Sequence, residues 1–224
     1  MPKTKLALLG KNISHSKSQE MYESLLGRNI DYELVDISDE AIVPSLQELF
    51  SVNEGLSITA PYKKFFLDEV VMDEETQRLN AINCIKKDGN QFFGFNTDYL
   101  ALNYIIQNQF SKMRNVYILG DGSMAHVLIC LLNKLAIPFE QFSRKNGDCL
   151  EKLDLSQLSK QTLVVNTCSR SFIFNGKISK EVTFFDLNYN FEEHDHLTQV
   201  SNYIDGLEML KLQAKFALEI WSIE

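Results

Sequence analysis

The sequence of 224 residues predicts an α/β protein made of two lobes, each built on a largely parallel sheet. Short apolar runs rich in β-branched and aromatic residues alternate with longer segments of helical periodicity. This alternation stops in the polar stretch 108–114 and then begins again with a new strand. No repeat or low-complexity linker interrupts the chain. We therefore expect two α/β lobes with a cleft between them.

Strand and helix signals alternate through the first half of the chain. We expect strands at residues 5–9, 32–37, 56–59, 81–85 and 92–95. We expect helices from residue 16 or 18 to residue 26, over residues 40–50 and over residues 98–109. Gly27 ends the first helix because glycine readily adopts the left-handed conformation that follows many helices. Pro61 follows the third strand, and Asp88-Gly89-Asn90 predicts a hairpin turn between the last two strands.

The second half repeats this pattern. We expect strands at residues 115–119, 139–143, 162–165 and 182–187. We expect helices at residues 123–136 and 206–222. Strands that alternate with helices in this way form parallel sheets, because a helix connects one strand to the next in the same direction.

Composition limits the classes of partner. The net charge of −8 argues against a general nucleic-acid binder and against binding to an anionic membrane surface. No apolar run approaches the ~20 residues that a membrane span needs, and we expect no signal peptide. None of the four cysteines forms a Cys-x-x-Cys pair, so we expect reduced thiols and a cytoplasmic location. His194-Asp195-His196 lacks a third ligand at a recognisable spacing, so we expect a solvated loop and no metal.

A dinucleotide-binding turn is predicted after the strand at residues 115–119. The turn matches the pattern G-x-G-x-x-A, with Gly120, Gly122 and Ala125, and a helix follows it. Gly120 permits a tight turn, Gly122 lets the backbone approach a pyrophosphate, and Ala125 permits close helix packing. The alternative is a strand-to-helix turn that uses glycine for its geometry alone. Asp121 counts against phosphate binding, because a carboxylate near a pyrophosphate is unfavourable unless it points away.

The end of the next predicted strand bears on the type of cofactor. Folds that bind NAD usually carry an acid there, which holds the ribose hydroxyls. This chain has Ser143-Arg144-Lys145 instead. Two cations suit a ribose 2′-phosphate, but a solvated basic turn is an equally good interpretation of these residues.

Polar residues follow several strand ends in the first half. They are Ser16, Ser18, Thr59, Lys63, Asn83 and Asp98. Ligands of open α/β sheets bind outside the carboxyl ends of the strands, so these side chains could converge. Each also has an ordinary structural interpretation: Ser16, Ser18 or Asp98 as a helix N-cap, and Lys63 as a surface lysine.

Taken together and in this order, these clusters resemble the shikimate dehydrogenase family. The matching motifs are His15-Ser16-Lys17-Ser18, Ser57-Ile58-Thr59-Ala60-Pro61-Tyr62-Lys63, Asn80-Ala81-Ile82-Asn83, Gly94-Phe95-Asn96-Thr97-Asp98, the glycine turn at residues 120–125, and residues 205–214, which read DGLEMLKLQA. The resemblance covers nearly the whole chain, and the motifs are specific in combination. It implies a substrate domain at residues 1–99 plus 206–224 and a shortened, Rossmann-like NADP-binding domain at residues 100–205.

The resemblance also implies an activity and a role for each site residue. The activity is the reversible, NADP-dependent reduction of 3-dehydroshikimate to shikimate, a step of aromatic amino acid biosynthesis. Lys63 and Asp98 would flank the reacting hydroxyl as the catalytic pair. The substrate would be bound by Ser16, Ser18, Thr59, Asn83 and Gln213, and NADP would be bound by Gly120, Gly122, Ser123 and Arg144. A monomer or homodimer is expected.

Several positions depart from the family pattern. Gln19, Ser57, Cys84 and Asp121 replace a proline, an asparagine, a threonine and a small residue. The family also usually has a tyrosine for the substrate carboxylate at a strand end, a position that we align with Phe185; Tyr189, four residues further on, could replace the missing hydroxyl. Two alternatives stay open: a dehydrogenase of quinate or another hydroxy acid on the same scaffold, and a non-catalytic paralogue that binds shikimate.

Overall fold

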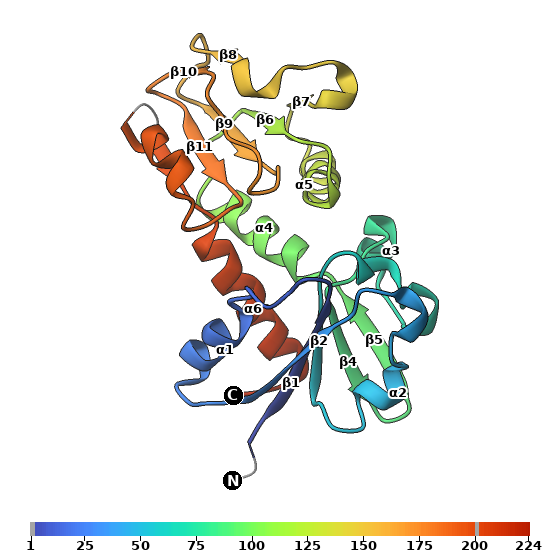
Figure 1. Cartoon of the computed structure of the whole chain (residues 1–224). Coiled ribbons are helices and arrows are strands. Elements are labelled where there is room, and N and C mark those ends of the chain that lie inside the picture. Colours follow the sequence, from blue (N-terminus) through green and yellow to red (C-terminus); the bar gives the residue numbers. More distant parts are fainter. Residues whose placement is uncertain (1–2, 200–201) are drawn as a thin grey trace. The chain divides into compact units, whose positions relative to one another are not determined.

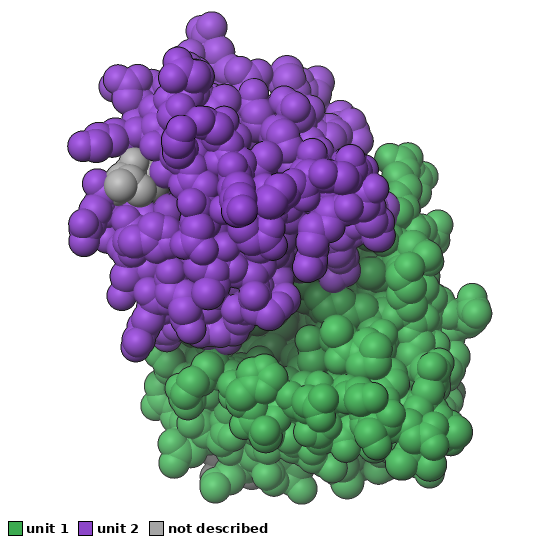
Figure 2. Space-filling model, turned by 45° about the horizontal axis from the view of Figure 1, so that its top comes forward, with its two compact units in different colours: residues 1–100, 211–224 green, residues 101–210 purple. Residues whose placement is uncertain are grey.

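The structure, a computed structural model, describes residues 3–199 and 202–224. It divides into two compact units, one of residues 1–100 and 211–224 and the other of residues 101–210 (Figure 2). Both units are α/β (Figure 1). None of the helices within the described ranges is long and apolar enough to cross a membrane.

The first unit is built on a mixed five-stranded sheet in the order β2-β1-β3-β4-β5. The strands are β1 (Lys5–Gly10), β2 (Asp31–Asp36), β3 (Gly55–Ile58), β4 (Cys84–Asp88) and β5 (Gln91–Phe95). The first three are parallel, whereas β4 is antiparallel to β3 and pairs with β5 in the predicted hairpin. The carboxyl ends of β1 and β3 lie side by side, since Leu9 pairs with Ile58. The segments that follow these two strands therefore start at one edge of the sheet.

Helices cover both faces of this sheet (Figure 1). The helical segments of this unit are α1 (Ser18–Leu26), η1 (Glu40–Ile42), α2 (Leu46–Leu49), η2 (Tyr62–Lys64), η3 (Leu67–Glu69) and α3 (Glu74–Leu79), the η segments being 3-10 helices. Two further helices, α4 (Thr97–Asn108) and α6 (Leu207–Trp221), each have residues in both units. On one face, α1 and α6 bury Tyr22, Ala214 and Trp221 against the sheet. Gly55 is required there, because a Cβ at this position would lie 2.4 Å from the Trp221 ring. On the other face, Leu46 and other residues of the α2 region pack against the sheet and form a second hydrophobic core.

The single helix predicted at residues 40–50 is wrong. The chain forms η1, breaks, and restarts as α2. Pro44 explains the break, because proline lacks a backbone N–H and disfavours a helical conformation in the residue before it; Val43 is extended. Ser45 and Glu48 then form a capping box that starts α2. The sequence analysis also omits α3, although Asp73 accepts a hydrogen bond as its N-cap.

The second unit has a five-stranded parallel sheet in the order β12-β11-β9-β6-β7. The strands are β6 (Asn115–Leu119), β7 (Phe139–Phe142), β9 (Thr162–Asn166), β11 (Thr183–Asp186) and β12 (Asn202–Ile204), and a separate pair is formed by β8 (Asp154–Leu155) and β10 (Lys177–Ile178). The helical segments are α5 (Ser123–Lys134), η4 (Arg144–Asn146), η5 (Leu150–Lys152) and η6 (Glu192–Gln199). The sequence analysis predicts neither β12 nor the β8–β10 pair, because two or three residues give too short a pattern.

Candidate active site

Lys63 and Asp98 form an ion pair in the first unit. Lys63 lies in η2, just after β3, and Asp98 lies in the first turn of α4, just after β5. Lys63 Nζ lies 2.7 Å from Asp98 Oδ2, and the two side chains are 18% and 14% exposed. The N-terminal end of α4 favours a negative charge at Asp98. The sequence separates these residues by 35 positions, and the sheet brings them together.

A buried hydroxyl organises the surroundings of this ion pair. Thr97 is 1% exposed, and its Oγ1 donates to Asn83 Oδ1 at 3.1 Å and contacts Gln213 Oε1 at 3.3 Å. The backbone N–H of Thr97 also donates to Asn83 Oδ1, at 2.7 Å. Asn83 and Gln213, which the family resemblance implies as substrate ligands, therefore meet at the residue before Asp98. Thr97 was not predicted to have a role, although it belongs to the Gly94–Asp98 motif.

The predicted serine pair lies before and at the start of α1. Ser16 Oγ donates to Ser18 Oγ at 3.1 Å, and the backbone N–H of Ser18 donates to Ser16 Oγ at 3.3 Å. The N-cap position of α1 is Lys17, whose side chain makes no capping bond. Both serines are half-buried. Thr59 follows β3, the strand beside β1, and is half-buried as well.

The glycine turn joins β6 to α5 in the second unit. Gly120 has φ +111°, in the region that favours glycine, and a Cβ there would lie 2.7 Å from Thr167 Oγ1. A Cβ at Gly122 would meet no atom within 4 Å. Gly122 is the N-cap of α5, which begins at the exposed Ser123, and Ala125 is buried. The first N–H groups of a helix have no partner within it, so this end of α5 can bind an anion.

The basic residues after β7 have different surroundings. Lys145 Nζ lies 2.8 Å from Asp121 Oδ2, so the carboxylate of the glycine turn is paired with a cation. Arg144 is exposed, and among the residues that the structure describes its guanidinium forms no hydrogen bond or ion pair. Only Arg144 of the two cations therefore has its charge free to bind a phosphate. Pairing with Lys145 also lowers the repulsion that Asp121 would exert on a pyrophosphate.

The expected solvated loop at residues 194–196 is wrong for its first histidine. His194 lies in η6 and is fully buried, with its Nδ1 2.5 Å from Asp186 Oδ2. His196 and Asp195 are exposed. Within the described part of the chain, no three histidine, cysteine or acidic residues are grouped in a way that could hold a metal ion.

The position that we align with the family tyrosine is a buried aromatic residue. Phe185 is 1% exposed, and its ring packs against Phe110 with the centroids 5.5 Å apart. A hydroxyl on this ring would be buried among apolar side chains. Tyr189 follows β11 and is half-buried.

None of the four cysteines forms a disulfide with another described residue. Burial raises the pKa of Cys84, and burial raises the pKa of Cys168 to about 11, although Arg144 opposes the second shift. Both thiols therefore stay protonated near neutral pH, the unreactive state.

Comparisons with known proteins match the chain over almost its whole length. Residues 8–85 match the family model of the shikimate dehydrogenase substrate binding domain. A shikimate dehydrogenase (NADP(+)) of Saccharolobus islandicus is 28% identical, and the match covers 97% of this chain and 89% of that protein. Shikimate 5-dehydrogenase from Thermus thermophilus, solved in complex with NADP(H) and shikimate, has a TM-score of 0.75 at 22% identity, covering 98% of this chain and 93% of that one.

Quinate dehydrogenase from Corynebacterium glutamicum, solved in complex with NAD, shares the fold with a TM-score of 0.69 at 18% identity, covering 98% of this chain and 94% of that one. The two-unit α/β fold is therefore that of the shikimate and quinate dehydrogenases, with an N-terminal substrate domain and a Rossmann-like cofactor domain. The chain is thus similar to the shikimate dehydrogenases over almost its whole length, and its residues 8–85 match the model of their substrate binding domain.

Proposed function

We propose that this protein catalyses the reversible, NADP-dependent reduction of 3-dehydroshikimate to shikimate. The observation that carries the proposal is the largely buried Lys63–Asp98 ion pair at 2.7 Å. A hydroxyl that is oxidised to a ketone must lose a proton, and a ketone that is reduced must gain one, so the site needs a positioned acid–base group. Lys63 is the candidate for this group.

Lys63 and Asp98 have complementary roles in the proposed reaction. In the reductive direction, Lys63 Nζ donates a proton to the oxygen that becomes the hydroxyl; in the oxidative direction, Nζ accepts it. Asp98 holds the ammonium through the 2.7 Å contact and so fixes where the proton is delivered. NADP, when bound, supplies the hydride acceptor, and NADPH the hydride donor.

Substrate recognition is assigned to the other polar residues of the first unit. Ser16 and Ser18 would donate to the substrate carboxylate, since hydroxyls donate well to anions. Thr59, Asn83 and Gln213 would bind the ring hydroxyls. Asn83 uses its carbonyl oxygen for Thr97, which leaves its amide nitrogen as a donor to the ligand.

The residues of the second unit fit a dinucleotide. The open space beside Gly122 admits a phosphate close to the backbone, and the exposed start of α5 at Ser123 offers N–H donors. The unpaired guanidinium of Arg144 suits the 2′-phosphate that distinguishes NADP from NAD. We accordingly assign residues 1–99 plus 206–224 to the substrate and residues 100–205 to NADP.

We also propose a class of partner and a cellular location for the protein. The net charge of −8 supports a small-molecule substrate and no nucleic-acid or membrane partner, and cysteines that form no disulfide among the described residues support a cytoplasmic location. A monomer or a homodimer is proposed as the working form.

The test is the absorbance of NADPH formed from NADP at alkaline pH with shikimate, with quinate or with neither. Turnover that is faster with shikimate than with quinate supports the proposal. Faster turnover with quinate assigns the chain to the alternative substrate. Binding of shikimate without any turnover contradicts a catalytic role and indicates a binding paralogue.

A further inference from the structure

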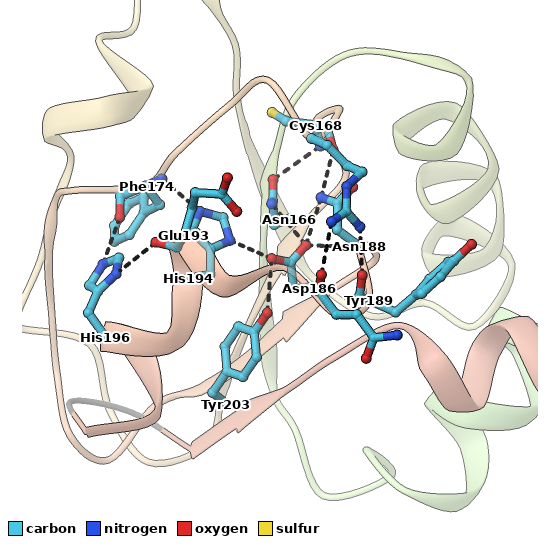
Figure 3. A network of polar contacts seen from close by, with 12 residues as sticks. Asn166, Cys168, Phe174, Asp186, Asn188, Tyr189, Glu193, His194, His196 and Tyr203 are labelled. Carbon is cyan, nitrogen blue, oxygen red and sulfur yellow. Dashed lines mark hydrogen bonds and ion pairs between the residues drawn. The ribbon is translucent and has the colours of Figure 1, made fainter. Parts of the chain in front are cut away.

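A network of polar contacts at the carboxyl end of β11 has no part in the mechanism above (Figure 3). Its centre is Asp186, which is fully buried. Asp186 Oδ1 accepts hydrogen bonds from the Asn166 side chain at 3.0 Å and from both the backbone and side-chain nitrogens of Asn188 at 2.9 Å. Asp186 Oδ2 accepts from His194 Nδ1 at 2.5 Å and from the Tyr203 hydroxyl at 3.2 Å. The Asp186 carboxylate thus accepts five hydrogen bonds, which fill its acceptor capacity.

The hydrogen-bond geometry fixes the tautomer of the His194 ring. The backbone N–H of Phe174 donates to His194 Nε2 at 2.9 Å, so Nε2 must carry a lone pair. The single ring proton therefore lies on Nδ1 and is donated to Asp186. Phe184 and Phe191 surround the ring edge-on, which keeps water from this bond.

The network extends from Asp186 to the segment after β9. Asn166 Oδ1 accepts from the backbone N–H of Cys168 at 3.1 Å, and Asn188 Nδ2 donates to the Cys168 carbonyl at 3.1 Å. Both asparagines also bond to Asp186 Oδ1. The backbone of Cys168 is thereby held at its N–H and at its carbonyl by two side chains that share one carboxylate.

The held segment lies directly against the glycine turn. The backbone N–H and the hydroxyl of Thr167 both donate to the Leu119 carbonyl, at 2.9 and 2.7 Å. A Cβ at Gly120 would lie 3.0 Å from Cys168 Sγ. The position of residues 167–168 therefore limits where the turn can lie. Displacing Asp186 would displace these residues and change the turn.

We propose that Asp186 and His194 are positioning residues of the cofactor site: they hold residues 167–168 against the glycine turn and so set the affinity for the dinucleotide. This inference rests on the proposed function, because it requires that the turn binds NADP. Both side chains are fully buried, so each acts through Asn166, Asn188 and the segment that they hold.

The experiment measures three quantities for each variant and for the wild type: the dissociation constant for NADPH by fluorescence titration, the KM for shikimate and the melting temperature. Tyr203→Phe removes one donor to Asp186 and little else. His194→Phe removes both imidazole bonds and keeps an aromatic ring among the phenylalanines. Tyr117→Phe is the matched control: it is the same change in β6 of the same sheet, where the hydroxyl forms no hydrogen bond to any described residue, although its ring stacks on Phe142.

The proposal predicts that Tyr203→Phe and His194→Phe each raise the Kd for NADPH by about 3- to 30-fold, the range typical of substitutions that act through a network. The KM for shikimate at saturating NADP should change by less than about twofold, within the range of a neutral substitution, and Tyr117→Phe should alter neither constant. Lower melting temperatures with an unchanged Kd in both variants would overturn the proposal, since they would make the network purely structural.

Asp186→Asn is a second, independent variant. An amide nitrogen in place of Oδ2 would face the Nδ1 proton of His194, and moving that proton to Nε2 would place it against the Phe174 N–H. Neither tautomer relieves the clash, so we expect the largest rise in Kd here, unless the variant fails to fold, in which case the other two variants decide. A wild-type chain that binds NADPH without oxidising shikimate contradicts the proposed function but still allows this test. A wild-type chain that binds no dinucleotide overturns both.

Discussion

Removal of the Lys63 amine is the most direct test of the chemistry. In the structure Lys63 Nζ contacts Asp98 Oδ2 at 2.7 Å, and both side chains are more than four-fifths buried. Lys63→Ala removes the acid–base group and leaves the serine pair and the Thr97 cluster in place. A general acid–base group contributes roughly 10²–10⁴-fold to a rate, so kcat should fall by about that factor. The KM for shikimate should change little.

The same change has a cost in stability. Asp98 would lose a charged hydrogen bond in a largely buried position, which we expect to lower the free energy of unfolding by roughly 1–3 kcal/mol. The remaining exposure and the N-terminal end of α4 limit the loss, because both stabilise the unpaired carboxylate. Denaturant unfolding measures this change in the free energy of unfolding independently of kcat.

The assay is the initial rate of NADPH formation with shikimate, and Lys64→Ala is the internal control. Lys64 is adjacent in the chain but exposed, and it forms no ion pair to any described residue. A severe loss of kcat in Lys64→Ala with a mild effect in Lys63→Ala would refute the assignment. A folded Lys63→Ala variant with near-normal kcat would refute acid–base catalysis by this side chain.

Three further predictions concern the second unit. Arg144→Ala should weaken binding of NADP by about 1.5–3 kcal/mol, the contribution of a charge-assisted contact, and leave NAD unaffected; equal losses in titrations with both cofactors would show that Arg144 does not bind the 2′-phosphate. Gly120→Ala should lower the melting temperature because its Cβ has no room, whereas Gly122→Ala should melt like the wild type and yet lose affinity for NADP. Tyr189→Phe should raise the KM for shikimate by roughly 3- to 10-fold at similar kcat. Phe185→Tyr should lower stability without improving KM, because its hydroxyl would be buried; a lower KM in Phe185→Tyr would show instead that position 185 binds the substrate.

Features that depend on adjacent residues could be predicted from the sequence. The Gly120-x-Gly122 turn lies between β6 and α5 as expected, because the glycine spacing, the preceding strand and the following helix are all local. The hairpin between β4 and β5 follows from its turn residues in the same way. The chain segments that carry Lys63 and Asp98 could be identified by their motifs, and their convergence was expected from the rule that ligands bind at the carboxyl ends of strands.

Features that depend on which distant side chains meet were decided only by the tertiary structure. Lys145 follows β7, and its charge pairs with Asp121 because the two segments lie at the same edge of a parallel sheet. His194 lies between two exposed residues, Glu193 and Asp195, and no local pattern distinguishes it from a surface histidine.

The burial of His194 arises from the aromatic rings of other segments and from Asp186, which lies eight residues earlier on β11. Phe185 likewise faces Phe110, a residue 75 positions away, so its orientation could not be deduced from the strand alone. The physical reason is common to these cases: the sequence periodicity fixes the local backbone, whereas the partner of a side chain depends on how strands pair and on which loops meet at their ends.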